Sequence, residues 1–235
     1  MTRVGGRPGP SPLTHARALD LWLARGAVAV VAGLQWVLVN DLSPGPRWLA
    51  PGLELALLLP LSAATAWNQG RARRATTEQH QRLVARHHRL IRLAAVVLTG
   101  LVTAMNTATL VALLQALLAG RAGGAPTLLL DALNVWATNV IVFALWFWTT
   151  DRGPRSAGPV DFLFPQMTLP REPGEPRFVP GFVDYLFLAF TNATAFSPTD
   201  TLPLSARAKL LMMAEASISL LTIALVAARA VNILS

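Results

Sequence analysis

The residues of this chain whose types could do chemistry in an apolar setting gather near its C-terminus. Glu215 stands inside a long apolar stretch. An ionisable group at membrane depth is costly, and by default it indicates a functional role. A polar loop precedes that stretch, and its candidate ion-contacting members are Thr194, Ala195, Phe196, Ser197, Pro198, Thr199 and Asp200.

The loop is unusual for backbone that sits between two apolar elements. Pro198 cannot continue a helix. Non-helical backbone at membrane depth is tolerated only where it is buried in protein or lines water. One interpretation is therefore a loop whose hydroxyls and carboxylate contact a permeating ion. The other is an ordinary surface loop that joins an interfacial helix to a spanning helix.

Glu215 also admits two interpretations. If the last helix lines a pore, copies of Glu215 from several chains would form an acidic ring that favours cations. Alternatively, the carboxyl group is bonded to a neighbouring helix or protonated by burial. Asn106, Asn134 and Asn139 lie in other apolar stretches, and we expect them to make hydrogen bonds between helices.

The composition indicates where these residues must lie. The chain has 235 residues, of which 53% are hydrophobic and 14% are charged, against about 25% charged in soluble domains. With its long apolar runs, this places the chain in a membrane. The absence of cysteine excludes disulfides and thiolate metal sites. No HExxH, GxSxG or P-loop pattern is present, so we expect neither an enzyme nor a bound cofactor or metal.

The apolar stretches predict an all-α membrane protein with about five transmembrane helices plus one re-entrant pore helix and loop. The re-entrant piece, Phe182–Phe196, would reach about 22 Å as a helix, short of the ~30 Å hydrocarbon core. A disordered basic leader over 1–20, a four-helix region over 21–149, a Pro-rich linker over 150–180 and a pore-loop module over 181–235 complete the expected organisation. The five expected spans are Leu21–Asn40, Leu49–Trp67, Leu93–Leu118, Thr127–Thr149 and Leu204–Leu234.

An arginine-rich loop over 69–92 is the strongest signal of orientation. The net charge of the chain is +8. Because the arginines cluster between apolar spans, membrane orientation explains them better than nucleic-acid binding does. The positive-inside rule places the loop in the cytoplasm. Four of its arginines share a helix face that we expect to touch anionic lipid headgroups, although a voltage sensor uses a similar row; they are Arg82, Arg86, Arg89 and Arg92.

The segment from Asn192 to Pro203, NATAFSPTDTLP, resembles the filter pattern TATTVGYGDxxP of potassium-channel-like proteins. The identical letters fall on Ala193, Thr194, Asp200 and Pro203. The resemblance implies a pore helix, a filter loop and an inner helix, assembled as a homotetramer. Both filter glycines are missing, and Pro198 lies within the filter segment. These changes should prevent the row of backbone carbonyls that binds potassium, so a filter of the potassium type is not implied.

The chain also resembles a family of uncharacterised bacterial inner-membrane proteins. These share its order of spans and an FT…F…DT segment, which here is Phe190-Thr191, Phe196 and Asp200-Thr201. This resemblance implies a multi-pass protein of the bacterial cytoplasmic membrane.

The sequence therefore predicts a pore-loop ion channel, with monovalent cations slightly favoured over anions. The alternatives are a non-conducting channel-like scaffold or regulator and a small transporter. The direction of the pore loop stays open. Potassium channels insert this loop from outside, whereas counting spans from the arginine-rich loop places residues 150–203 on the cytoplasmic side. Either the pore is inverted or one predicted span is wrong.

Overall fold

The structure of the 235-residue chain is a computed structural model, and most of its described residues are helical. The described residues are 12–38, 48–49, 51–53, 55–56, 58–59, 78–120, 125–151, 160–170, 172, 178–194 and 200–234. The elements in chain order are helices α1 (Pro12–Leu38), α3 (Glu78–Leu118) and α4 (Ala125–Asp151), strand β1 (Phe162–Leu163), the 3₁₀ helix η1 (Pro165–Met167), helix α5 (Phe182–Thr194), strand β2 (Leu202–Pro203) and helix α6 (Ala206–Leu234).

Within the described residues, three helices are long and apolar enough to cross a membrane. Their apolar parts are Leu93–Leu118 in α3, Thr127–Asp151 in α4 and Ala206–Arg229 in α6. At 1.5 Å per residue they reach about 36 to 39 Å, more than the ~30 Å hydrocarbon core. The expected class, a helical protein compatible with a membrane, is confirmed. The apolar part of α1, Trp22–Gly33, is shorter, and most of the expected span Leu49–Trp67 lies outside the described residues.

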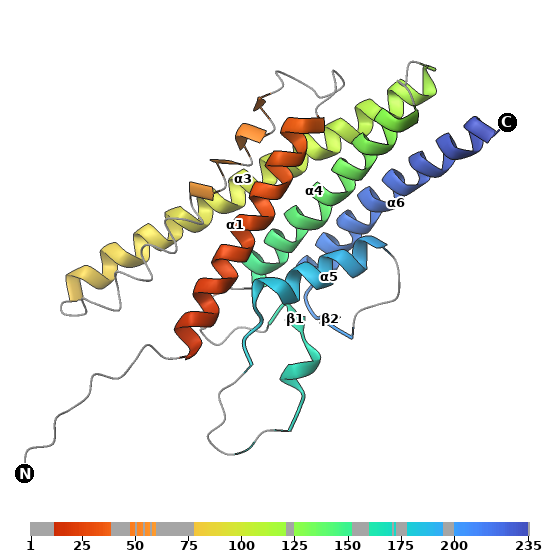
Figure 1. The fold of residues 1–235 in the computed structure, drawn as a ribbon. Helices are drawn as coiled ribbons and strands as arrows, with labels where there is room; N and C mark the ends of the chain where they lie inside the picture. The colour runs from red at the N-terminus through yellow and green to blue at the C-terminus, as the bar shows by residue number, and fades with distance from the viewer. Residues whose placement is uncertain are drawn as a thin grey trace, which may run out of the picture.

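Helix α4 is the centre of the bundle. Of the residues in the most apolar stretch of α4, 61% are buried inside the chain, against 28% for the corresponding stretch of α3 and 22% for that of α6. Helices α1, α3, α5 and α6 all contact it, as the green α4 among its neighbours shows (Figure 1). A helix that is apolar around its whole circumference is suited to such a position.

Helix α6 runs antiparallel to α4 over most of its length. Arg207, at the start of α6, reaches the carbonyl of Thr150. Near the middle, Asn139 of α4 contacts Glu215 of α6. Leu225 then packs in one apolar cluster with Leu128, near the start of α4. The end of α4 that carries Asp151, which we call the Asp151 end, therefore lies beside the beginning of α6.

Helices α1 and α3 differ from the sequence expectation at their starts. Helix α1 begins at Pro12, inside the expected disordered leader, and proline is favoured in the first helical turn. Helix α3 is one helix of 41 residues that contains both the arginine row and the expected span. Its first part has neither glycine nor proline and is rich in good helix formers, so the helix has no reason to break at the membrane boundary.

Strands β1 and β2 form a small antiparallel pair at the Asp151 end. Phe162 pairs with Pro203, and Leu163 pairs with Leu202. Phe162 is fully buried and packs against the rings of Phe147 and Tyr185. Residues 160–170, which the sequence analysis assigns to an irregular linker, thus hold an ordered strand and η1. This pair fixes where the chain lies just before α6.

Candidate functional site

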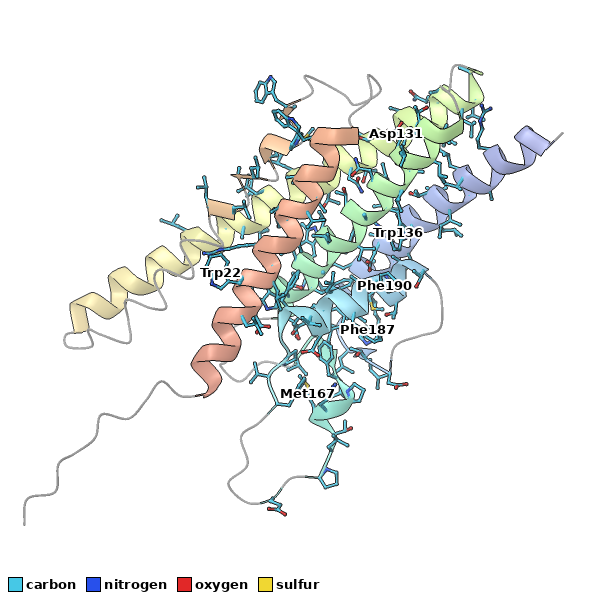
Figure 2. All side chains as sticks on the ribbon, in the orientation of Figure 1. Trp22, Asp131, Trp136, Met167, Phe187 and Phe190 are labelled. Atoms are coloured by element: carbon cyan, nitrogen blue, oxygen red, sulfur yellow. The ribbon has the colours of Figure 1, made fainter. Side chains whose placement is uncertain are left out.

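Helix α5 runs beside α4 from the Asp151 end towards the middle of α4. The Phe182 ring lies 5.6 Å from the Trp148 ring, and the Phe190 ring lies 5.7 Å from the Trp136 ring. The second pair is labelled in Figure 2. Trp136 precedes Trp148 by twelve residues, or about 18 Å along the helix. The C-terminal part of α5 therefore lies roughly halfway along α4.

The sequence of α5 accounts for this packing. Its fully buried side chains recur every three or four residues along one face, which is the pattern of a helix with one face in a core. They are Phe182, Tyr185, Leu188, Ala189 and Ala193. The helix has 13 residues and reaches about 20 Å, too short to cross a membrane.

Two carboxylates hold the first turn of α5. Asp184 Oδ2 accepts a hydrogen bond from the Gly181 backbone N–H at 2.7 Å. Asp20 of α1 accepts one from the Phe182 N–H at 3.1 Å. Acids are favoured at a helix N-terminus because they meet unpaired N–H groups. Burial raises the pKa of Asp184, the Gly181 N–H opposes that rise, and the nearby Asp20 carboxylate adds to it.

After α5 the chain is again found at the Asp151 end. The Leu204 N–H donates to the Asp161 carbonyl at 2.8 Å, next to the β1–β2 pair. The Asp161 N–H in turn donates to Asp151 Oδ1 at 2.8 Å. Residues 182 and 204 are thus both anchored near the last turn of α4, whereas residue 190 lies near its middle.

A buried polar cluster joins α4, α5 and α6, and we call it the Glu215 cluster. It consists of Asn139, Asn192, Glu215 and Ser219. Asn192 Nδ2 donates to Glu215 Oε2 at 2.7 Å and to the Met212 carbonyl at 3.0 Å. Asn139 Nδ2 donates to Ser219 Oγ at 2.8 Å and to the Glu215 carbonyl at 3.1 Å. Two asparagines therefore tie α6 to α4 and to α5.

The Glu215 carboxyl group has an incomplete set of partners. Its side chain has no exposed surface, and Oε1 makes no hydrogen bond. No arginine or lysine pairs with it among the described residues. A carboxylate that is buried without a cation is costly. The cluster is thus chemically suited to exchange a proton or to meet a cation.

A second polar cluster, the Arg207 cluster, lies at the Asp151 end. It consists of Asp151, Asp161, Tyr185 and Arg207. Arg207 forms an ion pair with Asp161 and also donates to the Thr150 carbonyl. The Tyr185 hydroxyl donates to Asp151 Oδ2. This cluster ties the beginning of α6, the β1–β2 pair and α5 to the last turn of α4.

The residues expected to contact an ion are only partly within the described chain. Residues 195–199, which include Ala195, Phe196, Ser197, Pro198 and Thr199, lie outside it. Thr194 ends α5, and its hydroxyl donates to the Phe190 carbonyl of the same helix at 2.9 Å. Asp200 is exposed, two residues before β2. The filter prediction stays a prediction.

Within a single chain, Glu215 is buried between helices and does not face outward, as a residue that lines a shared pore would. Its side chain points into the interface with α5 and α4, so a ring of Glu215 around an axis would need α6 to rotate or α5 to move. The arginine row at 82, 86, 89 and 92 lies on the first part of α3, and its side chains are outside the described part of the structure.

Two of the expected interhelical asparagines are confirmed. Asn106 of α3 donates to the Val135 carbonyl of α4 at 3.0 Å, and Asn139 bonds to α6. The sequence analysis missed Asn192, Ser219 and the Arg207–Asp161 pair. Asn192 follows Tyr185 and Leu188 at helical spacing, so its place on the buried face of α5 was a usable signal.

The described residues contain no group of three or more His, Cys, Asp or Glu side chains that could hold a metal ion. No protein-family model matches the chain, and the searches of curated proteins and of solved structures return no match either.

Proposed function

We propose that this chain is a pore-loop ion channel subunit, in which residues 182–203 enter and leave the membrane on one face. The observation that carries the proposal is the path of this segment. It begins and ends at the Asp151 end of α4, and Phe190 in between contacts Trp136 near the middle of α4. A short apolar helix followed by a return to the same face is the geometry of a re-entrant loop.

Cation preference follows from the direction of α5. The C-terminal end of a helix carries a partial negative charge. If α4 spans the membrane, the C-terminal end of α5 lies near the middle of the bilayer, where that charge attracts cations. Asp200 adds an exposed carboxylate close to the returning strand. One loop cannot enclose a pathway, so copies of the chain must surround an axis, and we take the assembly to be a homotetramer.

The contacts of α3 favour insertion of the loop from the cytoplasmic side. Thr103 of α3 accepts a hydrogen bond from Trp146, and Asn106 reaches Val135. Helix α3 is thus antiparallel to α4, and its arginine-rich beginning points to the same face as the Asp151 end. Under the positive-inside rule this face is cytoplasmic, which corresponds to the inverted arrangement and to a bacterial cytoplasmic membrane.

Bilayer recording of the purified chain, with asymmetric salt and ion substitution, tests this function. We expect cation-selective currents from the wild type. Asp200→Asn should lower the cation-to-anion permeability ratio several-fold, because it removes a carboxylate from the pathway. Asp200→Glu is the matched control, since it keeps the charge. Wild-type protein that is tetrameric but silent in every salt would favour a non-conducting scaffold or regulator.

A small transporter is the second candidate, and the burial of Glu215 within one chain favours it. Transporters bind their substrates near the bilayer midplane, inside the protein. The oligomeric state of the purified chain in detergent separates the two functions. A monomer that catalyses ion-coupled uptake in vesicles would replace the channel proposal, because a monomer has no shared axis.

A further inference from the structure

We propose that Glu215 of each chain is a proton-binding site, and that the bound proton holds α5 against α6. The site is distinct from the pathway residues 194–200 and lies within one chain. It goes beyond the proposed channel function, because proton binding by a single chain does not require conduction.

Within the described part of the chain, the geometry around Glu215 gives the carboxyl group one donor and no cation. Asn192 Nδ2 donates to Oε2 at 2.7 Å, and Oε1 is buried without a partner. A protonated carboxyl group still accepts through its carbonyl oxygen, so it keeps the Asn192 bond. It also removes the cost of placing an uncompensated negative charge among apolar side chains. The arrangement therefore fits the neutral acid better than the carboxylate.

Every helix packed against Glu215 presents neutral groups to it. Asn192 of α5 donates to the Glu215 carboxyl group and to the Met212 carbonyl, whereas Asn139 of α4 donates to the Glu215 backbone carbonyl and to Ser219 Oγ. Along α6, the ionisable residue closest to Glu215 is Lys209. It lies six residues away, or about 9 Å along the helix axis. The ionisable residues of these three helices, none of which contacts the Glu215 carboxyl group, are Asp131, Asp151, Asp184, Tyr185, Arg207, Lys209 and Arg229.

The proton is coupled to the position of α5 through Asn192. This one amide bonds both the Glu215 carboxyl group and the Met212 carbonyl, so it links α5 to two successive turns of α6. When the proton leaves, a negative charge remains in an interface that has no cation. Water or a cation must then enter, and the α5–α6 packing loosens. Thr194 is the last residue of α5, so proton release would change its position too.

Infrared spectroscopy of the full chain in lipid vesicles at neutral pH tests the proton directly. We expect a carbonyl stretch of a protonated carboxylic acid, and we expect Glu215→Gln to remove it. Selective ¹³C labelling of glutamate in the wild type covers the case in which the variant does not fold, because the chain has only five glutamates. No protonated glutamate band would overturn the proposal. A carboxylate band that responds to potassium or sodium rather than to pH would also overturn it and identify a bound cation.

Distance measurements between spin labels test the coupling to α5. The chain has no cysteine, so labels can be placed on Phe187→Cys in α5 and Met213→Cys in α6, whose side chains are 62% and 64% exposed. We expect one narrow distance distribution while the infrared band is present and a broader, longer one at alkaline pH where the band is lost. The same labels on a Glu215→Gln background should stay narrow at every pH. If the distance distribution between the two labels in the wild type does not change with pH, the proposed coupling between Glu215 and α5 is wrong.

Discussion

Arg207 pairs with Asp161 at the Asp151 end of α4, whereas Glu215, eight residues further along α6, has no cation among the residues that the structure describes. Eight residues correspond to about 12 Å along the helix. The Arg207 cluster contains two acids, a phenol and one arginine, whose side chain is 56% exposed. The Glu215 cluster contains one acid and three neutral partners, and the Glu215 side chain is fully buried.

The two clusters thus treat charge in opposite ways, although both join α4 to α5 and α6. At the Asp151 end the carboxylates meet an arginine, a phenol hydroxyl and one backbone N–H group. Each charge there is matched or solvated, so the Arg207 cluster serves to hold the architecture. The Glu215 cluster holds the same helices with a group whose charge is unmatched. An unmatched ionisable group at membrane depth indicates function rather than stability.

The difference also describes how α5 is anchored. Its first turn is fixed by Asp20 and Asp184, and Tyr185 bonds to Asp151. Its last turns are fixed mainly by Asn192 and by the ring of Phe190. The anchors at the beginning do not depend on a proton at Glu215, whereas the anchor at the end does. The end of α5 nearest the pathway residues is therefore the end that a change of protonation can release.

Asn192→Asp is the change that should break this contrast most strongly. It places a second carboxyl group against Glu215 and removes the amide donor. We expect a loss of stability on the order of 3–5 kcal/mol at neutral pH, as for other uncompensated buried charges. Thermal unfolding of the purified protein in detergent measures it. The loss should shrink at acidic pH, where the two carboxyl groups carry protons.

Asn192→Leu is the matched control for that experiment. It also removes the donor but adds no charge, so its cost should be about 1–3 kcal/mol, the range for a lost partner of a buried polar group, and nearly independent of pH. If Asn192→Asp and Asn192→Leu lower the stability equally at neutral pH, a second negative charge in the Glu215 cluster carries no penalty. The contrast between the two clusters would then be wrong.

Arg207→Gln addresses the matched cluster and should have a smaller effect. It leaves Asp161, whose side chain is 11% exposed, without its cation. Because Arg207 is itself half in solvent, we expect a loss of only about 1–2 kcal/mol. The double variant Arg207→Gln/Asp161→Asn should recover part of this loss, since no unmatched acid remains. Denaturant unfolding of the four proteins in a double-mutant cycle measures the coupling. Strict additivity of the two single changes would mean that the pair contributes nothing.

Three of the five predicted spans correspond to long apolar helices, because their signal is local. Leu93–Leu118 is expected and found, and α4 exceeds the expected Thr127–Thr149 by two residues at each end. The expected start of the re-entrant helix at Phe182 is also the start of α5. Asn106 and Asn139 were predictable too, since amides in apolar helices commonly bond to a neighbouring helix, whereas the Oδ1 of Asn134, expected to behave alike, is buried without a partner.

The pairings in both clusters could not be predicted in the same way. Asn192 and Glu215 are 23 residues apart, Arg207 and Asp161 are 46 apart, and Asp20 and Phe182 are 162 apart. Periodicity indicates which face of a helix is buried, but not which residue it meets. That depends on the relative depth of two helices, which the β1–β2 pair and the ring contacts of α5 determine. The sequence therefore identified Glu215 as a candidate and left two environments open for it, a pore lining and a bond to a neighbouring helix, and within one chain the carboxyl group bonds to Asn192 of α5.

Asp184→Asn should have the smallest effect on thermal stability. The pH dependence of that effect tests whether the beginning of α5, like the Glu215 cluster at its end, responds to protons. Burial and the nearby Asp20 raise the pKa of Asp184 above its ordinary value. The folded protein thus binds this proton more tightly than the unfolded chain, so the wild type loses stability as the pH rises from the ordinary pKa, about 3.9, through the raised one. Asparagine does not titrate and can still accept from the Gly181 N–H. The variant should therefore melt slightly higher than the wild type at neutral pH, and this advantage should vanish below the ordinary pKa. An advantage of equal size at every pH would show that the charge of Asp184 does not matter, and that only the Glu215 cluster responds to protons.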